Sequence, residues 1–149
     1  IYENLDSFKS DQKFDVITLW HVLEHLPNLG TAFREITERL SKKGHLFIAV
    51  PNPNSWDSKH YGAHWAGYDV PRHLYHFGQE AMGAFLKPYG LRILETKPMT
   101  FDAYYVSMLS ERHLTNPYSF IKVLYMGYLS NRSAYTSRQY SSLLYVIGA

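Results

Sequence analysis

FDVITLWHVLEHL (residues 14–26) and, further along, GHLFIAVPNPNSW (residues 44–56) are the stretches that decide the fold. Each begins with an almost unbroken apolar run, which is typical of a strand buried on both faces of a parallel sheet. The first run ends in a histidine-rich turn, and the second ends at Pro51 and Pro53. Open α/β sheets bind ligands outside the carboxyl ends of their strands. The two stretches therefore predict an α/β sheet with a polar site at one edge.

The rest of the chain supports this alternation of strands and helices. The predicted strands are 14–20, 46–50, 91–96 and 142–147, the first two parallel, and the predicted helices are 31–40 and 79–89, with helical spacing also at 120–129. Lys42, Lys43 and Gly44 are interpreted as the end of the first helix. Asn52 to Phe77 suits neither helix nor strand, and a loop of that length is usually functional. We expect one domain, with a core at 1–100, a helical insertion or lid at 101–141 and a last strand at 142–149.

Composition excludes several classes of site. The chain has no cysteine, so it has no disulfide, thiolate zinc site or cysteine nucleophile, which suits the reducing cytoplasm. A net charge of +2 does not favour a nucleic-acid partner. No apolar run has the length of a membrane span. Because the chain opens on Ile1, directly in what we interpret as structured sequence, we take it for a piece of a longer protein.

The two stretches resemble the fourth and fifth strands of class I S-adenosylmethionine-dependent methyltransferases, over residues 1–96. The resemblance is closest to bacterial small-molecule enzymes similar to the ubiquinone-biosynthesis O-methyltransferases. It implies a Rossmann-like three-layer α/β sandwich, of which this chain is the C-terminal part and lacks the first strands. It also implies S-adenosylmethionine as cofactor, with the adenine held near Asn4 and Leu5 and the methionine portion against Trp20 and His21.

In these relatives a segment like WAGYDVPRHLYHF (residues 65–77) lies over the reaction site. The implied activity is methyl transfer to an oxygen or nitrogen of a small metabolite or lipid-linked intermediate. Such a nucleophile needs a base that titrates near neutral pH, which favours histidine. His73, His21 and His76 are therefore candidate catalytic residues, and Arg72 is a candidate clamp for an anionic substrate. No metal is expected.

Two other functions compete with methyl transfer. His21, Glu24 and His25 match the H-x-x-E-H pattern of zinc-dependent hydrolases. That chemistry needs both histidines on one continuous helix, whereas a β-rich run precedes His21 and Pro27 follows closely, so Glu24 and His25 are expected to organise the turn. The other alternative is a non-catalytic binding or assembly module of the same fold.

The absence of the family's first strands leads to two further expectations. Phe14 to Trp20 would lose a neighbouring strand, and an exposed apolar edge invites self-association. These 149 residues alone are expected to be inactive and to bind S-adenosylmethionine weakly or not at all. Separately, Pro117 to Leu129 is either a lipid-facing amphipathic segment, giving a peripheral membrane contact, or a packed helix, which we favour.

Overall fold

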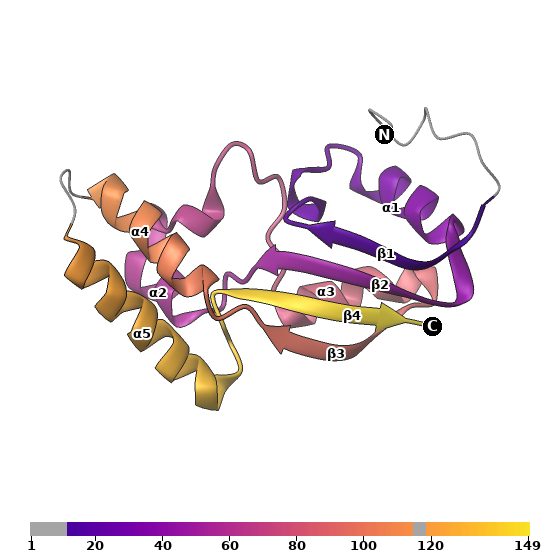
Figure 1. The fold of residues 1–149 in the computed structure, drawn as a ribbon. Helices are drawn as coiled ribbons and strands as arrows, with labels where there is room; N and C mark the ends of the chain where they lie inside the picture. The colour runs from indigo at the N-terminus through magenta and orange to yellow at the C-terminus, as the bar shows by residue number, and fades with distance from the viewer. Residues whose placement is uncertain (1–11, 115–118) are drawn as a thin grey trace.

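A four-stranded mixed sheet organises the chain in this computed structural model, which describes residues 12–114 and 119–149. The strands are β1 (Phe14–Trp20), β2 (Leu40–Pro51), β3 (Arg92–Pro98) and β4 (Ser142–Gly148), and their spatial order is β1-β2-β4-β3. β1 and β2 are parallel, whereas β4 is antiparallel to both β2 and β3 (Figure 1). The predicted α/β class and the parallel pairing of the first two strands are confirmed.

β2 is much longer than the sequence pattern predicts. It begins at Leu40 rather than near Leu46, so Lys42, Lys43 and Gly44 lie within the strand and the prediction that they end the first helix is wrong. The register between β1 and β2 shifts between Phe14 and Val16: Phe14 pairs with Leu40, whereas Val16 pairs with His45. A side chain at Gly44 would lie 2.9 Å from the Phe14 carbonyl oxygen, so glycine permits this close approach.

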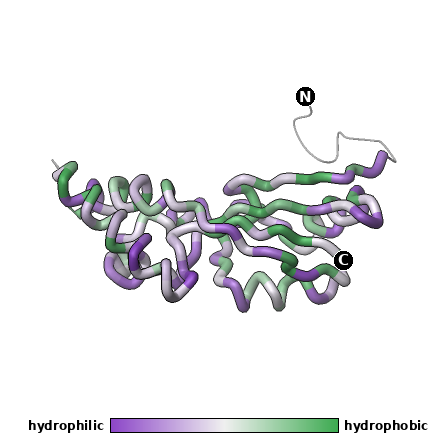
Figure 2. The backbone as a smooth tube through the Cα atoms, turned by 60° about the horizontal axis from the view of Figure 1, so that its bottom comes forward, coloured by the Kyte–Doolittle hydropathy of each residue, from purple (hydrophilic) through white to green (hydrophobic). Residues whose placement is uncertain are grey.

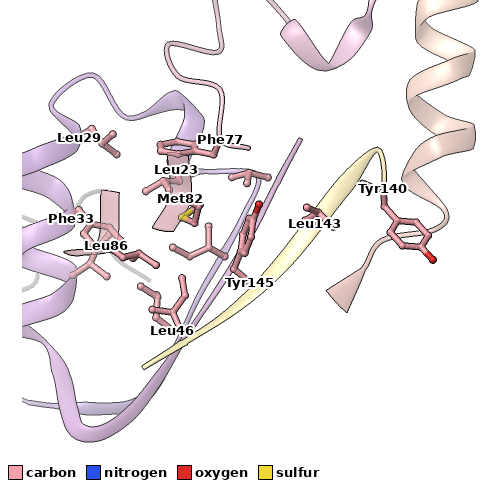
Figure 3. Close-up of a cluster of buried hydrophobic side chains, with 14 of the residues drawn as sticks. Leu23, Leu29, Phe33, Leu46, Phe77, Met82, Leu86, Tyr140, Leu143 and Tyr145 are labelled. Atoms are coloured by element: carbon pink, nitrogen blue, oxygen red, sulfur yellow. The ribbon is translucent and has the colours of Figure 1, made fainter. Parts of the chain in front are cut away.

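One face of the sheet is covered by α1 (Leu29–Glu38) and α3 (Gln79–Leu86). Their apolar side chains meet those of β2 and β4 in the main core, drawn in Figure 3. Phe33 of α1 also contacts Phe85 of α3, with ring centroids 4.6 Å apart. Figure 2 shows long hydrophobic stretches along the strands that supply this core. The helices were predicted at 31–40 and 79–89, and α1 ends earlier because Leu40 pairs with β1.

The opposite face of the sheet is partly exposed in the described residues. Val16 and Trp20 of β1 and Leu94 of β3 are each about half exposed on this side. β1 also lies at one edge of the described sheet, with β2 as its strand neighbour. These features are consistent with the expectation of an apolar edge at Phe14 to Trp20.

A second group of helices lies beyond the carboxyl ends of β1, β2 and β3 (Figure 1). It consists of α2 (Trp56–Tyr61), α4 (Asp102–Leu114) and α5 (Phe120–Ser137) and has a small core of its own around Tyr61, Trp65 and Val106. The segment expected as a helical insertion thus contains α4 and α5. No helix among the described residues has both the length and the apolar character needed to cross a membrane.

The segment from Asn52 to Phe77 is not the plain loop that the sequence predicts. It contains α2 and two short 3-10 helices, Gly62–His64 and Ala66–Tyr68. Ser55 caps α2 by accepting a hydrogen bond from the Ser58 amide. Asp57 of α2 is fully buried and accepts hydrogen bonds from Trp65 Nε1, Ser130 Oγ and Ser141 Oγ, each 2.7 Å long. Tertiary contacts, rather than helix propensity, thus hold this six-residue helix.

Candidate functional site

The histidine-rich turn leaves β1 through an unusual backbone conformation. The His21 amide still donates to the Ala49 carbonyl of β2, but His21 itself has φ of 50°, in the left-handed region that L-residues rarely occupy. The chain then enters a 3-10 helix, Leu23–His25. Strained residues of this kind concentrate at functional sites.

The Asp69 to Phe77 segment packs directly against this turn. The Leu74 amide donates to the Glu24 carbonyl at 2.8 Å, and the His25 ring, through Nδ1, hydrogen-bonds the Arg72 carbonyl at 3.0 Å. The structure thus places this segment against the histidine-rich turn at the carboxyl ends of β1 and β2. Glu24 and His25 do organise the turn, as expected.

His21 lies between two carboxylates. Its Nε2 is 3.3 Å from Asp102 Oδ2, at the start of α4, and its Nδ1 is 3.4 Å from Glu24 Oε1. The carboxylates of Asp102 and Glu24 outweigh partial burial and raise the pKa of His21 to about 9. His21 is therefore a cation at neutral pH, so it can donate hydrogen bonds but not accept a proton.

His73 has the opposite character. Its Nδ1 lies 2.9 Å from the Gly67 carbonyl oxygen, which can only accept a hydrogen bond. Nδ1 therefore carries the hydrogen, and Nε2 keeps its lone pair. Burial lowers the pKa of His73 from its ordinary value. At neutral pH this side chain is a neutral imidazole with one nitrogen open to protonation.

A pocket of about 520 Å³ adjoins these groups. That volume lies in the usual range for small-molecule sites. The polar side is formed mainly by His21, Asp69, Arg72, His73 and Asp102. Helix α4 supplies the other wall through Tyr105, Val106, Leu109 and His113. The pocket thus combines ionisable groups at the edge of the sheet with an apolar helical wall.

The other predicted site residues are placed less uniformly. Arg72 lines the pocket, but its side chain is 74% exposed and pairs with Asp69 Oδ1 at 2.6 Å. His76 does not line the pocket, and its Nε2 contacts the Tyr68 carbonyl at 3.1 Å. Trp20, at the end of β1, is 52% exposed. Asn4 and Leu5 lie outside the described residues.

The H-x-x-E-H pattern does not form the helix that zinc hydrolases need. His21 precedes the 3-10 helix, which extends only from Leu23 to His25. Among the described residues, the group able to hold a metal is instead Glu24, His25 and His73. The structure brings Glu24 to His73 from a distant segment.

Sequence reasoning missed Asp102 and the α4 wall of the pocket. Asp102 follows Thr100 and Phe101 and occupies the first turn of α4, where an acid is favoured by the helix dipole. The acidic residue Asp102 in the sequence could have indicated that a helix begins at this position. Nothing in the spacing of Tyr105, Val106 and Leu109 indicates that they face the histidines.

Comparison with known proteins gives a family and a fold. A family model described as a methyltransferase domain matches residues 2–96. A search of curated proteins found no match. Among solved structures, the cyclase SpnF is similar to this chain, with 17% sequence identity and a TM-score of 0.56. The alignment covers 97% of this chain and 53% of the SpnF chain.

Two further structures agree. A proposed sarcosine dimethylglycine methyltransferase from Galdieria sulphuraria has 14% identity and a TM-score of 0.55, with 96% of this chain and 56% of its own covered. The cyclopropane synthase MmaA2 from Mycobacterium tuberculosis has 13% sequence identity and a TM-score of 0.52. The alignment covers 95% of this chain and 57% of the MmaA2 chain. At these identities the likeness shows the fold alone. The chain spans little more than half the length of each of these structures.

Proposed function

This chain belongs to the methyltransferase domain family, and from that membership we propose that the protein containing it transfers a methyl group from S-adenosylmethionine. The proposed acceptor is an oxygen or nitrogen atom of a small metabolite or a lipid-linked intermediate. The observation that carries the proposal is the pocket at the carboxyl edge of β1 and β2, which His73 lines together with the apolar residues of α4. Parallel sheets bind their ligands at this edge.

The described residues fit part of the cofactor. Trp20 presents a half-exposed ring at the end of β1, next to the strained turn at His21. These two residues would hold the methionine portion, and Asn4 and Leu5 would hold the adenine. The cofactor supplies an electrophilic methyl group on a sulfonium whose leaving group is already good. The protein therefore mainly has to position the acceptor and exclude water.

His73 is the proposed base. Its Nδ1 hydrogen is held by the Gly67 carbonyl, so the ring cannot rotate freely and Nε2 keeps a lone pair. An acceptor hydroxyl hydrogen-bonded to Nε2 would pass its proton there as the methyl group is transferred. An ammonium acceptor would pass its proton to Nε2 first, which frees the nitrogen lone pair that then attacks the methyl group. General-base catalysis of this kind contributes roughly 10²–10⁴-fold to a rate.

His21 has a different proposed role, because it already carries a proton at neutral pH. Held between Asp102 and Glu24, it lines the pocket as a fixed hydrogen-bond donor. Arg72 adds a second cation, although Asp69 already takes two hydrogen bonds from its guanidinium group. Both cations are paired with carboxylates, so they offer hydrogen-bond donors rather than net positive charge to an acceptor. The α4 wall favours an acceptor with an apolar body.

Replacing His73 in the protein that contains this chain tests the proposal. His73→Ala should lower kcat by roughly 10²-fold or more, with the dissociation constant for S-adenosylmethionine unchanged. His64→Ala is the matched control, because His64 is exposed on the 3-10 helix Gly62–His64. Equal losses of turnover and cofactor affinity, or no loss of either, would remove His73 from the base role. A protein that methylates no acceptor with His73 intact would refute the proposed activity.

A further inference from the structure

Three side chains with metal-binding atoms meet beside the pocket. Glu24 and His25 come from the 3-10 helix after β1, and His73 comes from the segment packed against it. One ligand atom from each lies within 4.8 Å of the others. His73 Nε2 is 4.0 Å from Glu24 Oε1, and the rings of His25 and His73 are in edge contact with centroids 4.6 Å apart.

Both histidines are already oriented as metal ligands usually are. His25 Nδ1 lies 3.0 Å from the Arg72 carbonyl, and His73 Nδ1 lies 2.9 Å from the Gly67 carbonyl. Because a carbonyl oxygen only accepts, each Nδ1 carries a hydrogen, and in the neutral imidazole this leaves the lone pair on Nε2. Histidines that bind metals commonly donate their other nitrogen to a carbonyl in this way, which sets the tautomer and the ring orientation.

Glu24 provides an independent observation that points to a ligand. Its side chain is only 1% exposed, and within the described residues no hydrogen bond of good geometry reaches either carboxylate oxygen. The nearest positive group is the His21 ring, whose Nδ1 is 3.4 Å from Oε1. The His21 cation compensates Oε1 in this way, but a buried carboxylate oxygen that receives no hydrogen bond is still costly. Oε2 in particular has no partner there and is free to bind an ion.

We propose that Glu24, His25 and His73 form a binding site for a divalent transition-metal ion such as Zn²⁺. Two imidazole nitrogens and one carboxylate favour zinc or its neighbours over Mg²⁺, which prefers oxygen ligands. Three protein ligands leave the fourth position of a tetrahedral ion open to water or a substrate oxygen. Zinc bond lengths imply ligand separations of about 3.3 Å, so binding draws these atoms together by about 1 Å. The exposed His25 ring has room to move.

This site differs from the H-x-x-E-H pattern, because His21 is not one of its ligands and remains paired with Asp102. The proposed metal site and the proposed function both use the same atom, His73 Nε2. His73 Nε2 cannot bind a metal ion and accept a proton at once. Zinc occupancy should therefore inhibit methyl transfer if His73 is the base.

Calorimetric titration with ZnCl₂ tests the site in the metal-stripped protein without a histidine tag. We expect one ion per chain with a dissociation constant in the micromolar range or below. His25→Ala should weaken zinc binding by more than about tenfold. Removing a residue that only hydrogen-bonds a metal ligand already costs about that much, and His25 is proposed as a ligand itself. Glu24→Gln should do the same, but a change at this buried residue can also disturb folding. Because His25 is exposed, His25→Ala keeps the test valid.

The matched controls are His64→Ala and Glu80→Gln, both at exposed positions outside the group, and both should bind zinc like the wild type. Visible absorption of bound Co²⁺ should report a four-coordinate ion in the wild type and change in His25→Ala. No zinc binding, or binding that His25→Ala leaves unchanged, would overturn the site and leave the proposed function untouched. Zinc binding that activates methyl transfer, or leaves it unaffected, would keep the site and overturn His73 as the base.

Discussion

The buried Asp57 carboxylate should be among the largest single contributors to stability among the polar groups of this chain. It joins α2 to Trp65, to Ser130 of α5 and to Ser141 just before β4, through hydrogen bonds of 2.7 Å each. Hydrogen bonds to a charged group contribute about 1.5–3 kcal/mol each. After Asp57→Ala, the two serine hydroxyls can rotate to other acceptors, but the buried indole N–H of Trp65 cannot.

We therefore expect Asp57→Ala to lower the free energy of unfolding by about 3–5 kcal/mol, which is less than the sum of three charge-assisted bonds. For a domain of this size that corresponds to a fall in Tm of roughly 6–20 °C. Asp57→Asn keeps one acceptor oxygen for Trp65 and Ser141 and should cost only about 1–2 kcal/mol, the loss of charge assistance. The ranking of Asn and Ala follows from geometry alone.

Urea unfolding followed by far-ultraviolet circular dichroism measures these differences. Asp15→Ala is the matched control, because Asp15 is exposed and accepts one hydrogen bond from Ser41 Oγ at 2.7 Å. It should cost no more than about 1 kcal/mol. If Asp57→Ala is no more destabilising than Asp15→Ala, the reasoning about the buried carboxylate is wrong. An Asn variant as unstable as Ala would show that the charge, rather than the acceptor geometry, dominates.

Three further outcomes are expected. Asp102→Asn should lower the pKa of His21 from about 9 toward 6.5, measured by NMR titration in the presence of EDTA; an unchanged pKa would mean that Glu24 alone holds the proton. The 149-residue chain on its own should self-associate through the open edge at β1 and bind S-adenosylmethionine weakly or not at all, and a clean monomer with micromolar affinity in sedimentation and calorimetry would contradict this. Helix α5 has no acidic residue and exposes Ile121 and Tyr125. If it contacts lipid, the protein should co-sediment with anionic vesicles, and Ile121→Asp should abolish this binding. Equal co-sedimentation of the wild type and the variant would favour the interpretation of α5 as a helix packed within the protein.

The elements that sequence predicts well are those whose pattern is local. Phe14 to Trp20 forms β1 at the predicted residues, because its apolar and β-branched run favours a strand. The expected burial on both faces is wrong, since β1 lies at the edge of the described sheet and Val16 and Trp20 are about half exposed. α3 likewise begins at Gln79, as predicted. The first helix ends at Glu38, two residues earlier than predicted. Leu40 fits the helical spacing, but its pairing with Phe14 of β1 outweighs that preference.

The candidate site is predictable only in part for a related reason. The histidines of the first turn and those near Asp69 both stand out in the sequence, and the resemblance places them at one edge. Which atoms meet depends on tertiary packing. Glu24 gains His73 as a neighbour only because the Leu74 amide hydrogen-bonds the Glu24 carbonyl. Asp102 reaches His21 only because α4 folds back over the strand ends. Neither contact leaves a periodic signal.

The central position of β4 has a consequence for synthesis on the ribosome. β4 pairs with β2 on one side and β3 on the other, yet it follows β3 only after the two helices α4 and α5. Until residues 142–148 leave the exit tunnel, the apolar edge of β2 and the inner edge of β3 have no partner within the described sheet. Open edges of this kind pair readily with other chains. A pause in translation within α5 therefore lengthens the interval during which the nascent protein depends on chaperones.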